Sequence, residues 1–262
     1  MHSPISPQCS QWAQDDSRTV SELELNMRTF LQAICERYNS SPGIEYMDVV
    51  NETVIYGHWF THRPGFGWEV PWFKIGLDAD EKSTPLYIKY AFEIAQQYAP
   101  DIKLIYNHHE DPTATSSWDL IKATITYLRS QGLRVDGIGW QAYVDKGWDS
   151  AEKLDALREL IDWAQANALE FHITEASVWL KHGVSESLLI EQATTYRAII
   201  DVLLEKRGGG KVGWNTWHID DTAGWKIQFH PSLFDTKYTA KQAYYQIQDA
   251  LENPPVITVK DF

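Results

Sequence analysis

The sequence of 262 residues has little cysteine, no excess of basic residues and no long apolar run, and each shortage excludes a class of protein. Its two cysteines, Cys9 and Cys35, provide neither a disulfide framework nor a CxxC pair for zinc. Lys and Arg number 23 against 36 Asp and Glu, for a net charge of -13. Because nucleic acid and anionic lipid are themselves negatively charged, we expect neither nucleic acid nor a membrane as a partner.

No run of about 18 apolar residues occurs, so we expect no membrane-spanning helix. The opening "MHSPISPQCS" lacks a basic segment followed by an apolar one, so we expect no export signal, and the sequence assigns no compartment. Glycine-rich phosphate loops after a strand are also lacking, which argues against dinucleotide-binding and P-loop folds. The sequence shows no Gly-x-Ser-x-Gly elbow and no Cys/His pair, so nothing in it argues for acyl transfer.

Aromatic residues are abundant, with twelve Trp and 13% aromatics overall. A chain of this size and 44% hydrophobic content can bury one large core, and it lies in the range where α/β barrels form single domains. We therefore expect one catalytic domain over residues 1–262, with a tail from about residue 253. Tryptophan faces bind the C–H faces of sugars, although any single tryptophan is more often a core residue.

Helical and strand patterns alternate along the chain. The first helix is indicated by Leu23, Met27, Phe30, Leu31 and Ile34, which recur at helical spacing. The apolar run ending at residue 51 predicts a strand, and the strand and helix signals then repeat. The predicted helices are 17–38, 84–99, 116–131, 149–167, 185–207 and 238–251, and the later strands are 102–107, 135–143, 170–175 and 211–217.

Strands joined by helices belong to parallel sheets, which either close into a (β/α)8 TIM barrel or stay open and doubly wound. The barrel explanation accounts for more, because barrel active sites lie at the carboxyl ends of the strands. All five predicted strands end in polar or aromatic residues: Asn51 and Glu52; Asn107, His108 and His109; Gln141 and Tyr143; Glu175; Trp217. The long connection 53–84 is rich in aromatics and suits a cleft wall.

Glu52 and Glu175 each follow an apolar strand. Two carboxyl groups about 5 to 5.5 Å apart are the equipment of a retaining glycosidase, although spacing alone does not decide which is the nucleophile. A lone glutamate at a strand end is otherwise a common ion-pair or capping partner. Adjacent strand residues point to opposite faces, so we expect no metal site at His108 and His109, and no cofactor.

Several motifs in order resemble glycoside hydrolase family 10, the endo-β-1,4-xylanases. They are "DVVNE", "PWFKIGLD", "VDGIGWQAY", "HITE", "WHIDDTAGW" and "LFDTKYTAKQAYYQIQDAL", and the resemblance runs from about residue 2 to residue 251. The resemblance implies a (β/α)8 barrel that hydrolyses xylan or xylo-oligosaccharide with retention of configuration and without a cofactor.

The resemblance also implies roles for individual residues. Glu52 matches the acid/base, Glu175 the nucleophile, and Asn51 a neighbour that binds the sugar 2-hydroxyl. Trp217 and Trp225 match the aromatic walls of the cleft. The remaining residues at the strand ends are expected to contact substrate, namely Asn107, His109, Gln141 and Tyr143.

Three departures from the family pattern stand out. Tyr143 replaces the histidine of Gln-x-His that supports the nucleophile, and a phenol can donate to a carboxylate but cannot carry positive charge. His108 and His109 replace Asp-Tyr. The family's first two strands and most of its third are not matched in this sequence, so we expect an N-terminally incomplete barrel that self-associates into a homo-oligomer through its open edges.

Two alternatives to a xylanase stay open. The first is a non-catalytic carbohydrate-binding remnant that kept its cleft but lost productive geometry, and binding without release of reducing sugar would identify it. A barrel glycosidase for another β-linked glycan is the second, and a panel of substrates would distinguish it.

Overall fold

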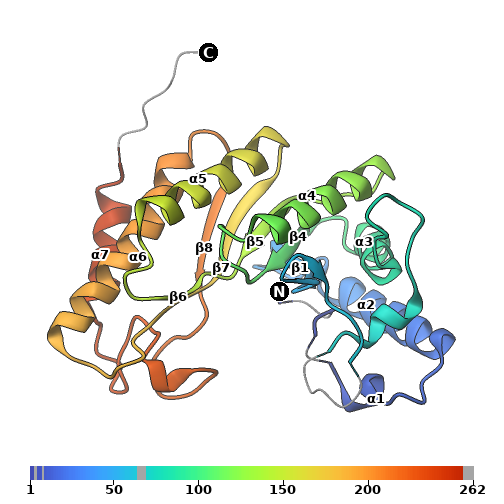
Figure 1. Ribbon diagram of the computed structural model, residues 1–262, viewed down its shortest axis with the longest axis horizontal. Helices are drawn as coiled ribbons and strands as arrows, with labels where there is room; N and C mark the ends of the chain where they lie inside the picture. The colour runs from blue at the N-terminus through green and yellow to red at the C-terminus, as the bar shows by residue number, and fades with distance from the viewer. Residues whose placement is uncertain (3–4, 8, 64–68, 256–262) are drawn as a thin grey trace. The chain divides into compact units, whose positions relative to one another are not determined.

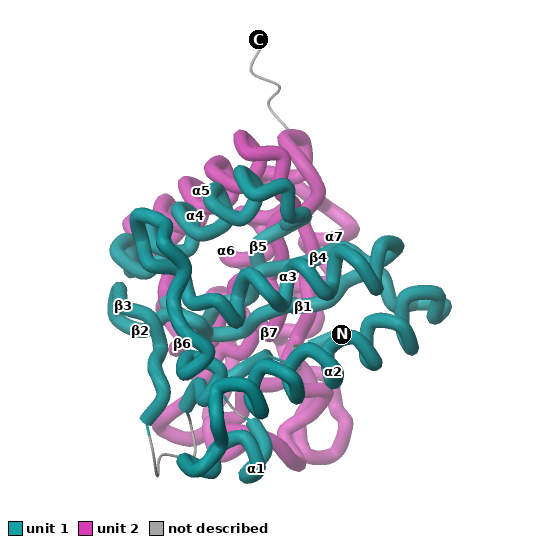
Figure 2. Tube along the Cα trace, turned by 90° about the vertical axis from the view of Figure 1, so that its right-hand side faces the viewer, with its two compact units in different colours: residues 1–110, 114–139 teal, residues 111–113, 140–262 magenta. Residues whose placement is uncertain are grey.

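The computed structural model describes residues 1–2, 5–7, 9–63 and 69–255, and these residues form two compact units (Figure 2). Unit 1 consists of Met1–Glu110 and Ala114–Gly139, and unit 2 of Asp111–Thr113 and Trp140–Phe262. Part of the predicted cleft wall, at 64–68, and the end of the predicted tail, at 256–262, lie outside the described residues. The single catalytic domain expected from the sequence stays a prediction.

Unit 1 contains a parallel strand pair with helices. β1 (Tyr46–Asn51) pairs in parallel with β4 (Lys103–His108), and β4 is followed in the sheet by β5 (Gly137–Trp140). Its helices are α1 (Gln11–Gln14), α2 (Val20–Tyr38), the 3-10 helix η1 (Pro71–Ile75), α3 (Leu86–Tyr98) and α4 (Thr115–Ser130) (Figure 1). A short hairpin joins β2 (Val54–Ile55) to β3 (His58–Trp59) (Figure 2).

The strands of unit 1 are buried on both faces, as the parallel arrangement requires. Met47, Val49 and Val50 of β1 are fully buried, as are Leu104 and Tyr106 of β4. This burial explains why the strands read as continuous apolar runs in the sequence.

Helix α2 begins with a capping box, in which the Thr19 side chain accepts from the Glu22 backbone and the Glu22 carboxylate accepts from Thr19. Its buried face consists of Leu23, Met27, Leu31 and Cys35. Phe30 was predicted on this face, but its side chain is 51% exposed. The buried residues of α2 recur at every fourth position, and Phe30 lies outside that series.

The N-terminal segment forms hydrogen bonds with the edge of β1 that does not pair with β4. The backbone N–H of Asp48 donates to the carbonyl oxygen of Met1 at 3.0 Å, and that of Asn51 donates to Ile5 at 3.0 Å. The Met1 amino group donates to the Tyr46 carbonyl at 2.6 Å. The described residues of this segment therefore satisfy part of the backbone edge of β1.

Unit 2 contains three parallel strands, in which β7 (Glu170–Trp179) lies between β6 (Tyr143–Asp145) and β8 (Val212–Thr216). Its helices are α5 (Ala151–Ala166), α6 (Glu186–Lys206), the 3-10 helix η2 (Ile227–Phe229) and α7 (Gln242–Glu252), and α6 packs against α7 (Figure 1). Residues 111–113 attach to this unit, since Trp148 donates from Nε1 to the Asp111 carboxylate at 2.6 Å.

The predicted strand 135–143 is not continuous. It divides into β5 and β6 around Gln141 and Ala142, because Ala142 adopts a left-handed backbone with φ of +59°. The Ala142 carbonyl still accepts from Ser177 of β7 at 3.1 Å. The break changes the direction of the chain between Gln141, which follows β5, and Tyr143, which begins β6.

The alternation of parallel strands and helices is the pattern that the predicted (β/α)8 barrel class requires, and the described residues supply five strand positions of it, one of them divided between β5 and β6. The six predicted helices are present as α2 to α7. In the part of the chain that the structure describes, no helix has the length and apolarity needed to cross a membrane.

Asp78 anchors the segment between η1 and α3. Its Oδ2 accepts from Lys89 of α3 at 2.8 Å and from the Tyr127 hydroxyl of α4 at 2.5 Å. The hydrogen bond from Lys89, followed by that from Tyr127, lowers the pKa of Asp78 to about 2. One carboxylate thus ties the segment to two helices.

We expect Asp78→Asn to lower the free energy of unfolding near pH 7 by about 1–2 kcal/mol, because a charge-assisted contact to each helix is weakened. Asp78 has a lowered pKa when folded, so its contribution is present above the ordinary pKa of an aspartate and is lost as the pH falls toward 2. Urea unfolding should therefore show the difference between variant and wild type shrinking below about pH 4. Glu81→Gln, at an exposed carboxylate, is the control; an equal loss in both variants would contradict the assignment.

Candidate active site

Glu52 lies immediately beyond β1 in a left-handed backbone conformation, with φ of +54°. Its N–H donates to the carbonyl oxygen of Asn107 in β4 at 3.1 Å. A non-glycine residue in this conformation is strained by about 1 kcal/mol or more, and such strain gathers at functional sites. The turn ends the strand at Asn51 and leaves the Glu52 side chain half-buried.

Asn51 and Asn107 are register partners in the two parallel strands. Asn107 donates from Nδ2 to Oδ1 of Asn51 at 2.9 Å, and both side chains are buried. Asn51 also donates from Nδ2 to the Ser6 hydroxyl at 3.4 Å. Buried amides held by such contacts have a defined orientation, so both predicted sugar-binding asparagines are fixed beside Glu52.

A two-residue turn follows Glu52 and joins β2 to β3. Tyr56 and Gly57 both have positive φ, as the tight hairpin turn that matches strand twist requires. The Tyr56 N–H donates to the Glu110 carboxylate at 3.1 Å, and the Gly57 N–H donates to the Ser117 hydroxyl at 2.8 Å. The sequence did not predict this hairpin, because tyrosine is not a typical residue of such turns.

His108 and His109 lie close together, contrary to the expectation that they point to opposite faces. Their ring centroids are 4.8 Å apart. The reason is that β4 ends at His108, so strand alternation no longer applies to His109. His108 is fully buried with its ring edge against Trp118, and its Nε2 lies 3.3 Å from the Glu110 carboxylate.

Two pKa values beside Glu52 are displaced. Burial, assisted by His108, lowers the pKa of His109 to about 4, while the carboxylates of Glu52 and Glu110 oppose this shift. Burial alone would raise the pKa of Glu110, but hydrogen bonds from His108, Ser117 and the Tyr56 backbone outweigh it and lower the pKa to about 2. At neutral pH, His109 is therefore a neutral imidazole next to carboxylates.

Glu175 lies within β7 of unit 2 and is buried. The Tyr143 hydroxyl donates to its Oε2 at 2.5 Å. Charge-assisted O–H···O⁻ hydrogen bonds have this length and are among the stronger ones in proteins. The tyrosine that replaces the family histidine thus contacts the predicted nucleophile directly.

An aromatic cluster surrounds Tyr143. Trp179 stacks on the Tyr143 ring with centroids 6.0 Å apart, and Trp225 meets the ring edge-on at 5.0 Å. Trp179 also contacts Trp225 at 5.7 Å and Phe229 at 6.0 Å. Because Trp225 is 50% exposed, the cluster offers an aromatic face to solvent while its inner side holds Tyr143.

The other predicted residues of unit 2 lie at strand ends. Gln141 is buried at the break between β5 and β6. Trp217 follows β8 and is 38% exposed, and its N–H donates to the Ala176 carbonyl of β7 at 3.4 Å. Unit 2 thus gathers Tyr143, Glu175 and Trp225, whereas Glu52 belongs to unit 1, and the separation of the two carboxylates stays a prediction.

The sequence did not predict the roles of Trp179 and Phe229 in this cluster. Trp179 lies four residues after Glu175 in the same strand, and alternate strand residues share a face, so this signal was present. Phe229 ends the three-residue 3-10 helix η2, which is too short to leave a periodic pattern in the sequence. Among the described residues no group of three or more His, Cys, Asp or Glu is arranged to hold a metal ion.

The comparisons with known proteins agree with this architecture, a (β/α)8 barrel with polar strand ends. The model of glycosyl hydrolase family 10 matches residues 2–250. Endo-1,4-beta-xylanase C of Paenibacillus barcinonensis is 27% identical over 247 residues, which cover 88% of this chain and 22% of that protein. The chain belongs to glycosyl hydrolase family 10.

Solved structures support the same assignment. Xylanase 10B from Thermotoga maritima superposes with a TM-score of 0.77 at 27% identity, covering 94% of this chain and 71% of that one. Xylanase 10B from Thermotoga petrophila RKU-1, solved in complex with xylobiose, has a TM-score of 0.77 at 27% identity, covering 94% of this chain and 70% of that one. The chain spans about a fifth of the length of the first curated relatives.

We expect His109→Gln to flatten the acid dependence of stability. The unfolded chain takes up a proton at the ordinary histidine pKa, whereas the folded chain does so only near pH 4, so wild-type stability falls as the pH drops from about 6.5 to about 4. Urea unfolding at several pH values measures this slope. His58→Gln, at an exposed histidine of the same unit, should keep the wild-type slope; parallel slopes for all three proteins would refute the buried neutral imidazole.

Proposed function

We propose that this chain is a retaining endo-β-1,4-xylanase that cleaves internal bonds of xylan by double displacement. The observation that carries the proposal is the buried Glu175 carboxylate, held by the Tyr143 hydroxyl beside a half-exposed tryptophan. Family membership supports a glycosidase, and the xylobiose bound by the Thermotoga petrophila relative supports xylo-oligosaccharide as the substrate class.

In the first step Glu175 attacks the anomeric carbon while Glu52, protonated, donates its proton to the departing glycosidic oxygen. In the second step Glu52 removes a proton from water, and the water oxygen displaces Glu175 from the anomeric carbon. Two inversions give overall retention. The two carboxyl groups must lie about 5 to 5.5 Å apart for this chemistry.

Several further side chains bind the sugar in the proposed complex. Asn51, fixed by Asn107, is oriented to bind the 2-hydroxyl, and such contacts accelerate reaction when they strengthen in the transition state. Trp217 and Trp225 present exposed faces for the C–H faces of the sugar, and His109 and Gln141 line the strand ends.

Tyr143 acts on Glu175 as a neutral donor. Its hydrogen bond orients the carboxylate and stabilises its charge before attack, and that charge disappears in the glycosyl ester. The self-association expected from the sequence remains a separate prediction about the same protein.

The function is tested by the reducing ends that the purified chain releases from xylan. Glu175→Gln should abolish release while the fold is kept, because the glutamine oxygen can still accept from Tyr143. Glu52→Gln should lose xylan hydrolysis but retain the first step on an aryl xylobioside, whose leaving group needs no proton. Binding without release by the wild type would instead identify a carbohydrate-binding remnant.

We expect Tyr143→Phe to lower kcat by about 10- to 100-fold, because the hydrogen bond that orients the Glu175 carboxylate for attack is lost, and a misplaced nucleophile slows a reaction by about this factor. Steady-state kinetics on xylo-oligosaccharide measures the effect. Tyr245→Phe removes the hydroxyl of an exposed tyrosine in α7 and should leave kcat unchanged. Equal kcat values for Tyr143→Phe and wild type would remove the hydroxyl from the mechanism.

A further inference from the structure

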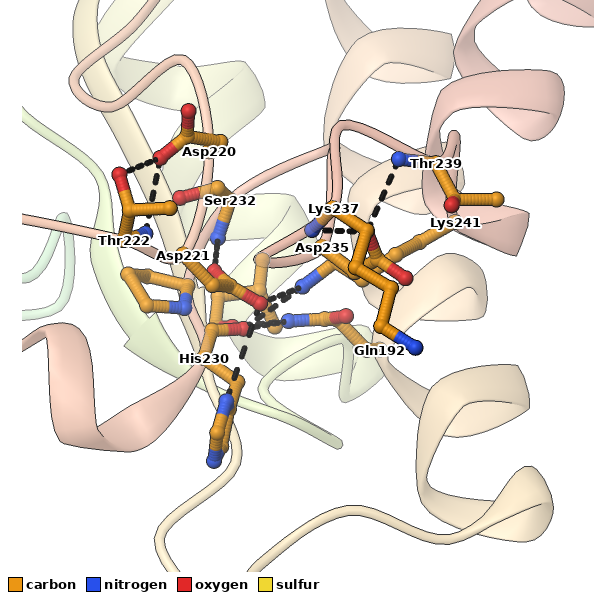
Figure 3. Close-up of polar contacts among 12 residues, drawn as sticks. Gln192, Asp220, Asp221, Thr222, His230, Ser232, Asp235, Lys237, Thr239 and Lys241 are labelled. Carbon is orange, nitrogen blue, oxygen red and sulfur yellow. Dashed lines mark hydrogen bonds and ion pairs between the residues drawn. The ribbon is translucent and has the colours of Figure 1, made fainter.

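The loop 217–241 between β8 and α7 is closed at its base by one buried side chain. The backbone N–H of Asp221 donates to the Phe234 carbonyl at 3.2 Å. Its Oδ1 accepts from the Ser232 N–H at 2.9 Å, and its Oδ2 accepts from Lys241 Nζ at 3.0 Å (Figure 3). Asp221, in the first half of the loop, therefore contacts Ser232 and Phe234 in the second half and Lys241 at the start of α7.

Asp221 and Lys241 are both more than nine-tenths buried. Burial lowers the pKa of Lys241, and the charge of Asp221 opposes that shift. Lys241 also donates to the His230 carbonyl at 2.9 Å, and His230 Nδ1 lies 3.8 Å from the Asp221 carboxylate. Desolvating two such charges costs several kcal/mol each, so removal of one partner leaves an expensive unpaired charge.

The second half of the loop, at residues 229–231, is linked by hydrogen bonds to β7, the strand that carries Glu175, and to the residue that follows it. Gln192 of α6 donates from Nε2 both to the His230 carbonyl at 2.8 Å and to the Val178 carbonyl at 2.7 Å (Figure 3). The Tyr196 hydroxyl donates to the Pro231 carbonyl at 2.6 Å and accepts from the Val178 N–H at 3.2 Å. The Leu180 N–H donates to the Phe229 carbonyl at 2.7 Å.

Trp225 lies at the tip between these anchors. It touches the rings of Tyr143 and Trp179, and its carbonyl lies 2.9 Å from His218 Nε2. The following residue, Lys226, has a left-handed backbone, which L-residues adopt only when the surroundings impose it. A continuous path of contacts therefore runs from Lys241 through Asp221 and the loop to Trp225, Tyr143 and Glu175.

We propose that the buried ion pair of Asp221 and Lys241 is a positioning device, which holds the loop so that Trp225 stays against Tyr143 and Tyr143 stays on Glu175. Its catalytic consequence rests on the proposed function. The order of the loop does not, and it can be measured without turnover. Both residues act through the loop and through other side chains, so they are positioning residues.

Asp221→Asn tests the device. The variant keeps an oxygen for the Ser232 N–H but leaves the Lys241 ammonium buried without its counter-charge. Tryptic cleavage after Lys226, followed by mass spectrometry on the folded protein, should accelerate by about tenfold or more, because native proteolysis reports local opening. Cleavage after Lys82, in an exposed turn of unit 1, serves as the internal reference and should be unchanged.

The kinetic consequence separates positioning from simple destabilisation. A loosened Trp225 should raise KM for xylo-oligosaccharide by about threefold or more, whereas loss of folded protein alone lowers only the apparent kcat. Asp249→Asn breaks the exposed ion pair with Arg197 that joins α6 to α7, and it should alter neither KM nor cleavage after Lys226.

Since Asp221→Asn can fail to fold, the double variant Asp221→Asn, Lys241→Met carries the same test without an unpaired charge. Raised KM and faster cleavage after Lys226 in this folded variant support the inference. Wild-type values of both overturn it. A wild type that releases no sugar from xylan would contradict the proposed function instead. The rates of cleavage after Lys226 would still decide whether the ion pair of Asp221 and Lys241 holds the loop.

Discussion

Parallel pairing places every strand's carboxyl end at the same edge of its sheet, and the chemistry of this chain depends on that constraint. In unit 1 the pairing sets Asn51 opposite Asn107, and in unit 2 it sets Tyr143 opposite Ser177, two residues beyond Glu175. Side chains that are distant in sequence are brought together because hydrogen bonds fix the register of their strands. Because the carboxyl ends of the strands lie at an edge of the sheet, a polar residue can follow directly after a fully buried apolar run.

The edge of each sheet is also where backbone strain gathers. Glu52, Tyr56 and Ala142 all have positive φ, and each lies where the chain leaves a strand. Such conformations persist only where surrounding contacts determine them, and here those contacts include the carbonyl of Asn107 and the carboxylate of Glu110. The strained turns aim side chains that a regular strand would have directed elsewhere.

Tyr143 contacts Glu175 through an uncharged group. Its hydroxyl donates to the Glu175 carboxylate, and a phenol brings no positive charge to it. The position of the ring depends on aromatic neighbours that reach it from β7 and from the loop before α7. Because Trp225 enters that cluster from a loop, the geometry at Glu175 depends on how the loop is anchored.

The sequence by itself determined the alternating strands and helices, the barrel class, and Glu52 at the end of β1, because periodic burial is a local property of a chain. The strand predicted to end at Glu175 runs on to Trp179. Tertiary structure alone decided the exposure of Phe30, the break at Ala142 and the closeness of His108 and His109. It also decided the buried pairing of Asp221 with Lys241, 20 residues apart. Such contacts depend on where whole elements pack, and no local pattern of residues encodes that placement.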